Sequence, residues 1–451
     1  LRIAGRNSRL RPNTKSAGLK RVHMSMLGLS ERAENCRASI YFLLAVFSMI
    51  ISPCSVSAEA ISIRRGVNIE AWQQWTNEKS FVADWYDRTN FPDWIKTVND
   101  GQLKSLRLQG FDFVRLNVDP SVFFWKPTDK NIIIEQIVEA TVRLQNAGFK
   151  VIVDMHLLPD MPDRSFGLHT ILGTGGVSES GFQPYATLLT EIASRLDLLP
   201  KQLTALELIN EPDQDWFSHW AITDRWPEQL GAIYRAARKG SKDLTLVLSG
   251  ARGGGIDGLI RLDPSLWIGD PNVIWSFHFY EPFEITHSGL PWMRDGQHFL
   301  VGLPFPAELL DDVLRKKLLE RARVEISTDI RDVATRNKLA AEVSNALAHY
   351  SASGASPKTL DHELARVGKW ASDHGIPPNR ILLGEFGVFQ DKVSMETRTA
   401  ILAATHKAAE KYGFAWAVYT AGLTQPKSSF SVIGDRETLK LEPEVARALG
   451  L

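Results

Sequence analysis

The stretch LELINEPD, residues 206–213, is apolar for most of its length and then ends on Asn210, Glu211 and Pro212. Asn and Pro are turn residues, and proline cannot continue a strand ladder, so a strand that stops at a turn is one interpretation. The carboxylate needs a further reason, because burying a charge costs free energy unless it is paired. A functional interpretation gains weight if other strands of the chain also end on polar groups.

Short runs rich in Val, Ile, Leu and Phe recur after residue 60, and longer stretches with helical spacing follow them, as in residues 132–149 and 395–413. This alternation is typical of strand and helix units around a parallel sheet. Eight runs are predicted strands: residues 64–72, 113–118, 150–156, 203–212, 244–251, 273–281, 381–389 and 413–420. We therefore predict an α/β fold, a (β/α)8 TIM barrel. A doubly wound sheet, the structural competitor, would want a glycine fingerprint after its first strand, and RRGVNIEAWQQW has none.

A long insertion is predicted after the sixth strand, at about residues 282–375. Residues 283–306 are aromatic and loop-like, residues 307–350 are charged and helical, and residues 351–359 suggest a turn or linker. We expect the aromatic part to lie near the functional site.

The first 58 residues predict a leader that contains a secretory signal peptide, read from about Met24 or Met26. Arg32 and Arg37 precede the apolar run 40–51, and small residues follow up to Ala58, after which cleavage is expected. The run is too short to span a bilayer comfortably, so no stable membrane anchor is expected. Residues 59–451 then form the predicted catalytic domain, which we expect to be secreted, periplasmic or extracellular, and monomeric.

The charge balance argues against nucleic acid as a partner. The formal net charge is zero, but the leader is basic, so the remaining chain carries more acidic than basic residues. A nucleic-acid-binding surface would instead show a basic patch. The glycine runs at 173–176 and 252–255 lack the Lys-Ser/Thr of a phosphate loop and are predicted loops.

Polar side chains recur at the carboxyl ends of the predicted strands, where barrels of this type place their catalytic groups. They are Arg115, His156, Asn210, Glu211, His278, Tyr280, Glu385 and Trp416. Singly, each has an ordinary structural explanation as an ion-pair partner, a satisfied core histidine or a packing aromatic. Their convergence on one end of a barrel is poorly explained by folding alone, since buried polar groups need partners.

Glu211 and Glu385 are the informative pair. Their strands lie across a closed eight-stranded barrel from each other, so the two carboxyl groups could face a bound sugar from opposite sides. Glycosidic bond cleavage needs an acid for the leaving oxygen and a second carboxylate, roughly 5 Å away in retaining enzymes and farther in inverting ones. This requirement offers a reason for a core strand to end on Glu211.

The chain resembles glycoside hydrolase family 5, the cellulase-like retaining enzymes, over about residues 62–425. The resemblance lies in the ordered motifs FVRLNV, VIVDMH, LELINEP, SFHFYEPF, LLGEFG and FAWAVY. It implies that Glu385 is the nucleophile and that Glu211 is the general acid and later the base. No metal and no cofactor are implied.

The resemblance also implies roles for the supporting residues. Asn210 would bind the sugar 2-hydroxyl, and Arg115 and Tyr280 would keep Glu385 ionised and oriented. His156 and His278 would orient the substrate and the acid, and Trp416 would lie beneath the sugar. Five tryptophans are candidates for further sugar-stacking surfaces, and we expect two or three of them to line subsites: Trp72, Trp125, Trp216, Trp220 and Trp292.

These expectations favour a secreted endo-β-1,4-glucanase acting on a polysaccharide or oligosaccharide. Mannan, xyloglucan or exo-acting β-glucosidase activity stays open, because loop residues read the substrate. A metal-dependent hydrolase would need a ligand cluster such as His-x-His on the first strand, which GVNIEAW lacks. A non-catalytic glycan-binding protein on the same fold is the alternative outside catalysis.

Overall fold

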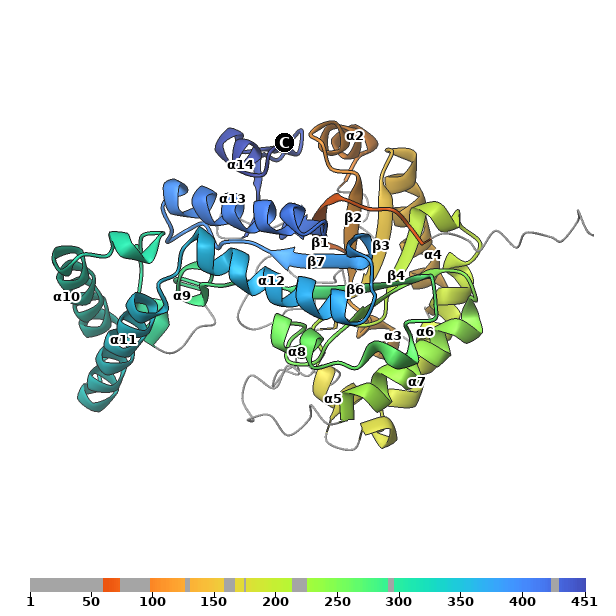
Figure 1. Cartoon of the computed structure of the whole chain (residues 1–451), viewed down its shortest axis with the longest axis horizontal. Coiled ribbons are helices and arrows are strands. Elements are labelled where there is room, and N and C mark those ends of the chain that lie inside the picture. Colours follow the sequence, from red (N-terminus) through yellow and green to blue (C-terminus); the bar gives the residue numbers. More distant parts are fainter. Residues whose placement is uncertain are drawn as a thin grey trace, which may run out of the picture. The chain divides into compact units, whose positions relative to one another are not determined.

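A computed structural model describes residues 60–73, 98–125, 130–157, 167–173, 176–212, 225–290, 296–422 and 430–451. They belong to one compact unit, residues 57–451. Parallel strands pair in sequence order and close on themselves, since β8 also pairs with β1 (Figure 1). The predicted (β/α)8 barrel is confirmed. The predicted leader, including Ala58, lies outside the described residues.

The barrel strands begin close to the predicted positions, and the third to the eighth end earlier than predicted. They are β1 (Arg65–Gln73), β2 (Phe113–Val118), β3 (Lys150–Met155), β4 (Thr204–Glu207), β5 (Thr245–Ser249), β6 (Val273–His278), β7 (Ile381–Phe386) and β8 (Ala415–Val418). The difference is largest at β4, predicted to reach residue 212. Asn210 N–H still donates to the Met155 carbonyl of β3 beyond the end of β4. The chain therefore stays between its neighbours while it leaves regular strand geometry.

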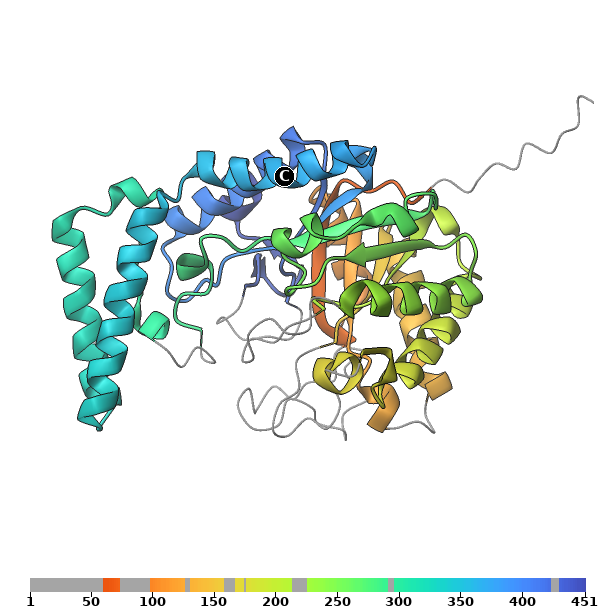
Figure 2. The same ribbon diagram turned by 60° about the horizontal axis from the view of Figure 1, so that its bottom comes forward.

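Helices cover the outside of the barrel, while α10 (Asp312–Asp329) and α11 (Val333–Ser353) project away from it (Figure 2). The other described helices are α2 (Asp100–Leu108), α3 (Val122–Trp125), α4 (Lys130–Asn146), α5 (Leu168–Leu172), α6 (Phe182–Leu196), α7 (Trp226–Gly240), α8 (Ile256–Ile260), α9 (Phe283–Thr286), α12 (Pro357–Asp373), α13 (Met395–Lys411) and α14 (Pro443–Ala448). A two-stranded sheet of β9 (Ile433–Asp435) and β10 (Lys440–Leu441) precedes α14. Among the described helices, none combines the length and apolar character that a membrane span requires.

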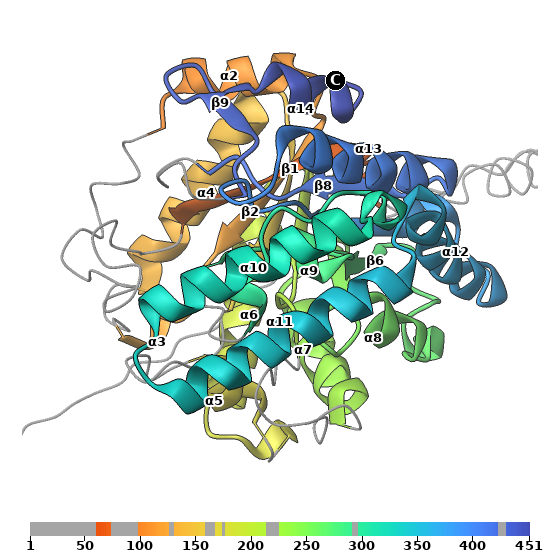
Figure 3. The ribbon, with the colours of Figure 1, turned by 90° about the vertical axis from the view of Figure 1, so that its left-hand side faces the viewer.

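The connection from β6 to β7 holds a helical hairpin of α10 and α11, which lie side by side (Figure 3). The next helix, α12, packs against α8 and α13 of the barrel's outer layer. The insertion is thus shorter than the predicted range 282–375, because α12 is the barrel's own helix. The predicted linker is shorter too: α11 ends at Ser353 and is capped by Gly354, whose φ is 59°, and Ser356 caps α12 with its side chain. A serine followed by proline is a helix-start signal that the prediction overlooked.

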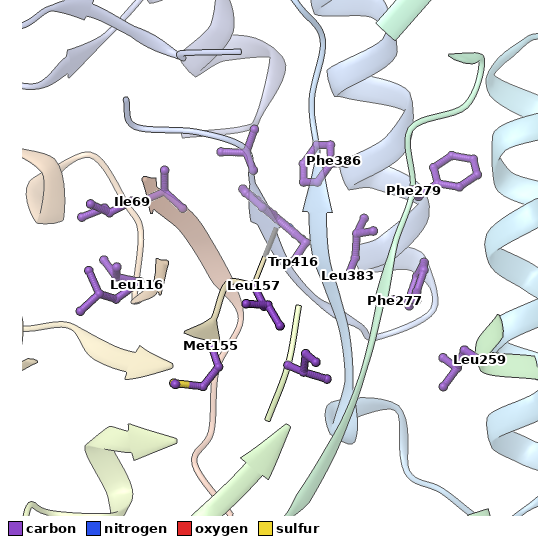
Figure 4. Close-up of a cluster of buried hydrophobic side chains, with 14 of the residues drawn as sticks. Ile69, Leu116, Met155, Leu157, Leu259, Phe277, Phe279, Leu383, Phe386 and Trp416 are labelled. Carbon is purple, nitrogen blue, oxygen red and sulfur yellow. The ribbon is translucent and has the colours of Figure 1, made fainter. Parts of the chain in front are cut away.

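The barrel interior is built in layers. One apolar cluster takes one residue from each of β2 to β7 and two from β8, and it includes the two isoleucines that precede β1: Ile61, Ile63, Phe113, Ile152, Ala205, Val247, Ile274, Leu382, Ala415 and Ala417. A second and larger cluster fills the space between strands and helices, and part of it is drawn in Figure 4. The inward-facing residues next along the strands are polar, so the apolar layer supports a polar one at the carboxyl end.

We predict that Gly66→Ala lowers the free energy of unfolding by about 1–3 kcal/mol, the usual cost of overpacking a core. A Cβ at Gly66 would lie 2.3 Å from Cζ of Phe113, which is fully buried and cannot easily move away. Urea unfolding measures the change. Gly269→Ala is the control, because a Cβ there meets nothing within 4 Å. Equal stabilities of the two variants would contradict the packing.

Candidate active site

Arg115 of β2 is fully buried in the polar layer and holds four strands together. Its Nε donates to Glu207 at 2.6 Å and its Nη1 to Oε1 of Glu385 at 2.6 Å. Its Nη2 donates to Asn210 at 2.9 Å and lies 3.1 Å from an Asp154 oxygen. Burial works against the cation, but the three carboxylates outweigh it and raise the pKa of Arg115 well above its usual range.

Asp154 and Glu207 are buried carboxyl groups that the sequence prediction missed. Burial raises the pKa of Asp154 to about 7 and also raises that of Glu207, while Arg115 opposes both shifts. Three carboxyl groups surround the single cation of Arg115, and the raised pKa values of Asp154 and Glu207 favour their protonated forms. The available signal was strand alternation: Asp154 and Glu207 occupy the inward-facing register next to Ile152 and Ala205 of the apolar layer.

Glu385 projects into the barrel mouth because β7 is irregular. Strict alternation from Leu382 would turn residue 385 outward, but the pairing with β6 shifts register so that Phe277 pairs with Leu383 and His278 with Glu385. Such an extra residue re-aims the following side chain. Both carboxylate oxygens are held, Oε1 by Arg115 and Oε2 by the Tyr280 hydroxyl at 2.9 Å.

Tyr280 stays a hydrogen-bond donor over the working pH range. Burial, with the Glu385 carboxylate as the next contribution, raises the pKa of its hydroxyl well above the usual value. The proton of this hydroxyl therefore remains available for the hydrogen bond to Glu385.

Glu211 follows β4 in a backbone conformation that non-glycine residues rarely adopt, with φ of 40°. Such strain clusters at functional sites, where the surrounding structure holds it. Its Oε1 shares a hydrogen bond of 2.7 Å with Nδ1 of His278, and its side chain is 19% exposed. Burial raises the pKa of Glu211 to about 7. The strand end in LELINEPD therefore presents a carboxyl group that is reachable and retains its proton near neutral pH.

The structure brings the two predicted glutamates together. One carboxylate oxygen of Glu211, one of Glu385 and one ring nitrogen of His278 all lie within 4.8 Å of one another. Burial lowers the pKa of His278 to about 4, so this ring is neutral near neutral pH and separates the two carboxyl groups without adding a charge.

His156 follows β3 and is buried. Its Nδ1 lies 2.7 Å from an Asp154 oxygen and 2.6 Å from Nδ2 of Asn117. Burial lowers the pKa of His156, which favours the neutral ring. These contacts fix the orientation of the imidazole.

Two glycines make room for this arrangement. A Cβ at Gly384 would lie 2.5 Å from the Ser276 hydroxyl and 3.2 Å from Nε2 of His278. Gly254, in the run 252–255 predicted as a loop, has φ of 69°, and its carbonyl accepts from the His278 N–H. This glycine loop therefore supports the histidine that contacts Glu211.

Trp416 does not take the expected place beneath a sugar. Ala415 and Ala417 face the barrel interior, so alternation turns Trp416 outward, where it is fully buried. Figure 4 shows it in one apolar cluster with Leu383 and Phe386. Its ring packs edge-on against Phe386 at 5.7 Å between centroids, and its Nε1 donates to Glu410. Trp416 is a packing aromatic.

Among the other tryptophans predicted to stack on sugars, the prediction for Trp72 is wrong and none is confirmed. Trp72 is fully buried, with the guanidinium of Arg143 5.3 Å from its ring centre, so it has no free face for a sugar. Trp125 ends α3, but its side chain is outside the described part of the chain, as are Trp216, Trp220 and Trp292 altogether.

Two functional candidates were missed at the ends of β1 and β8. Tyr419 lies two residues beyond Ala417, in the inward-facing register, and its hydroxyl donates to Oε2 of Glu70 at 2.5 Å. Glu70 is 6% exposed and lies in register with Asn68, which contacts Arg115. Counting alternate residues from Ala415 would have found Tyr419 in place of Trp416.

Glu211, His278 and Glu385 are also spaced as three ligands of a metal ion could be. Oxygens of both glutamates are already bonded to protein groups, and Nη1 of Arg115 lies 2.6 Å from Glu385. A guanidinium at that distance repels a metal cation. The donor set therefore fits acid–base chemistry better than metal binding.

We predict that Arg115→Met lowers the free energy of unfolding by about 3–5 kcal/mol at pH 8, because it leaves buried carboxylates without their cation. The loss should shrink at pH 5, since Asp154 and Glu207 then take up protons and no longer need it. Urea unfolding at both pH values is the measurement.

Arg366→Met provides the matched control. Arg366 also pairs with two carboxylates, Asp257 and Glu363, but at a surface position where such pairs contribute little. A loss for Arg115→Met no larger than that of the control, or independent of pH, would show that the Arg115 network does not stabilise the barrel.

Comparison with known proteins places this site in a family. Endoglucanase 3 of Fibrobacter succinogenes is 24% identical over 387 residues, covering 80% of this chain and 52% of its own length. Cellodextrinase A of Ruminococcus flavefaciens is 24% identical over 246 residues, covering 52% and 63%. The chain thus spans between half and two thirds of the length of these curated relatives.

A solved structure shares the fold. Thermotoga maritima Cel5A in complex with mannotriose superimposes with a TM-score of 0.57 at 19% identity, covering 86% of this chain and 97% of that one. The family model for cellulase (glycosyl hydrolase family 5) matches residues 69–424, which include every residue of the site from Glu70 to Tyr419. The chain belongs to glycosyl hydrolase family 5.

Proposed function

We propose that this protein is a secreted retaining glycoside hydrolase that cleaves β-1,4-glucan within the chain by double displacement. The observation that carries the proposal is that one carboxyl oxygen of Glu211 and one of Glu385 lie within 4.8 Å of each other at the mouth of a family 5 barrel. Retaining glycosidases hold their two carboxyl groups ~5 Å apart, whereas inverting enzymes need roughly 6.5–9.5 Å to admit a water.

Glu385 is the nucleophile in this proposal. Its two oxygens are oriented by hydrogen bonds from Arg115 and Tyr280. The carboxylate attacks the anomeric carbon, the bond to the leaving oxygen breaks, and a covalent glycosyl-enzyme forms.

Glu211 is the general acid and then the base. Its raised pKa keeps the proton that the leaving oxygen takes up when the glycosidic bond breaks. As a carboxylate it then removes a proton from the water that hydrolyses the intermediate and returns to its starting form. His278 orients this carboxyl through their hydrogen bond.

The substrate contacts follow from the same geometry. Asn210 is buried, and its side-chain oxygen accepts a hydrogen bond from Arg115. The amide nitrogen of Asn210 is available to bind the sugar 2-hydroxyl. His156 is oriented toward the substrate by Asp154 and Asn117. No role in sugar binding is proposed for Trp416 or Trp72.

The β-1,4-glucan substrate is supported by the names of the curated relatives, an endoglucanase and a cellodextrinase. Secretion is supported by the sequence of the leader, with its basic start, the apolar run 40–51 and the small residues before Ala58. Mannan and xyloglucan are the competing substrates.

Hydrolysis of a polysaccharide panel tests the proposal. The chain from Glu59 onward should release reducing sugar from soluble β-1,4-glucan faster than from mannan, xylan or xyloglucan, and Glu385→Ala should lose this activity by several orders of magnitude. Glu308→Gln, an exposed position far from the strands, is the control and should keep full activity. If no polymer is cut while an oligosaccharide still raises the unfolding temperature, the protein binds glycans without cleaving them.

The pH profile tests the role of Glu211. Since its pKa is about 7, the competent acid is present below pH 7 and is lost as the pH rises through that value. We predict that kcat/KM on polysaccharide falls about tenfold per pH unit above pH 7. With a dinitrophenyl β-cellobioside, whose leaving group needs no proton, kcat/KM should not fall above pH 7. If kcat/KM falls above pH 7 with both substrates, the titrating group is not Glu211.

A further inference from the structure

Glu70 is a buried carboxyl group that the proposed mechanism does not use. It lies in β1, two residues beyond Asn68 in the inward-facing register, and is 6% exposed. Burying a carboxyl group costs free energy, and the Tyr419 hydroxyl satisfies only one of its oxygens, Oε2. A role in function would explain why such a group lies in the barrel mouth.

The barrel order places Glu70 and Tyr419 on the side of Glu385. Strand β1 pairs with β8, and β8 pairs with β7, which carries Glu385. Glu211 follows β4, which is directly across an eight-stranded barrel from β8. The acid faces the leaving group and the nucleophile faces the sugar ring that it attacks, so Glu70 and Tyr419 lie beside that attacked ring.

Glu70 and Tyr419 interact electrostatically with the proposed catalytic carboxyl groups. Burial raises the pKa of Glu70 to about 7, the hydrogen bond from Tyr419 opposes this shift, and the Glu385 carboxylate adds to it. Burial likewise raises the pKa of Tyr419 well above its usual value, and Glu70, Glu385 and Glu211 all contribute. The Tyr419 ring is fixed from outside by an edge-on contact with Phe430 at 5.8 Å.

We propose that Glu70 and Tyr419 form a binding site for one hydroxyl of the sugar ring that becomes attached to Glu385. Glu70 accepts a hydrogen bond from that hydroxyl, and Tyr419 holds the carboxyl group in place through its own hydrogen bond. This inference rests on the proposed glycosidase function and names two substrate-binding residues for it.

The chemistry of a β-1,4-glucan limits which hydroxyl is bound. In the attacked ring O2 is assigned to Asn210, O4 is the linkage to the next sugar, and O5 is in the ring. The 3-hydroxyl and the 6-hydroxyl remain. A glycan substituted at the bound hydroxyl would not fit this ring position, so the pair also determines specificity.

A combined substitution and deoxy-substrate experiment tests the proposal. The protein variants are Glu70→Gln and Tyr419→Phe, which keep shape and ring packing, with Glu308→Gln as the control. The substrates are 2,4-dinitrophenyl β-cellobioside and its analogues that lack the 3- or the 6-hydroxyl of the ring bearing the dinitrophenyl group. We measure kcat/KM for each combination and the unfolding temperature of each variant.

At pH 8, above the pKa of about 7 of Glu70, the expected result is a loss of about 10- to 100-fold in kcat/KM for Glu70→Gln, the size of one hydrogen bond to a charged group. Tyr419→Phe should lose less. One of the two deoxy substrates should be penalised in the wild type and not in Glu70→Gln, because the interacting partner is already absent.

Two outcomes would overturn the proposal. In one, Glu70→Gln keeps wild-type kcat/KM. In the other, each deoxy substrate loses as much kcat/KM with Glu70→Gln as with the wild type, which would make Glu70 a structural group only. Failure of the underlying function is distinguishable, because the wild type would then turn over none of the three substrates.

Discussion

The site depends on one buried cation surrounded by several acids. Arg115 contacts carboxylates from β3, β4 and β7, and these strands supply or precede the residues that face the substrate. A buried charge is stabilised only by such partners, and each partner is costly without it. The same hydrogen bonds that neutralise Arg115 therefore fix the position of Glu385 and, through Asn210, the end of β4 beside Glu211.

The polar layer holds more acids than cations, and the two glutamates have different hydrogen-bond partners. Glu385 has a guanidinium and a phenol hydroxyl on its oxygens, whereas Glu211 has a neutral histidine. Burial raises the pKa of Glu211 to about 7, which favours a protonated acid at that position. One barrel mouth thus holds the two carboxyl groups of the proposed mechanism in different surroundings, above the apolar layer of the barrel interior.

Strand order and the two glutamates could be predicted from the sequence, because apolar runs alternate with helical spacing and each ends on a polar group. Local departures from regularity could not. The extra residue in β7 turns Glu385 inward against simple alternation, and φ of 40° re-aims Glu211. The error at Trp416 had the opposite cause: β8 is regular there, and alternation from Ala415 points to Tyr419. Asp154 and Glu207 lie inside the predicted strands 150–156 and 203–212, before the polar residues at the predicted strand ends.

The most direct test of this account is to trap the covalent intermediate. A 2,4-dinitrophenyl 2-deoxy-2-fluoro-β-cellobioside should release dinitrophenolate and attach one fluorocellobiosyl group per protein molecule, and peptide mass spectrometry should locate this group as an ester on Glu385, the proposed nucleophile that Arg115 contacts. A label on Glu211, or on a carboxyl outside the barrel mouth, would contradict the assignment. So would polysaccharide cleavage that yields the inverted anomer first, because no covalent intermediate then forms.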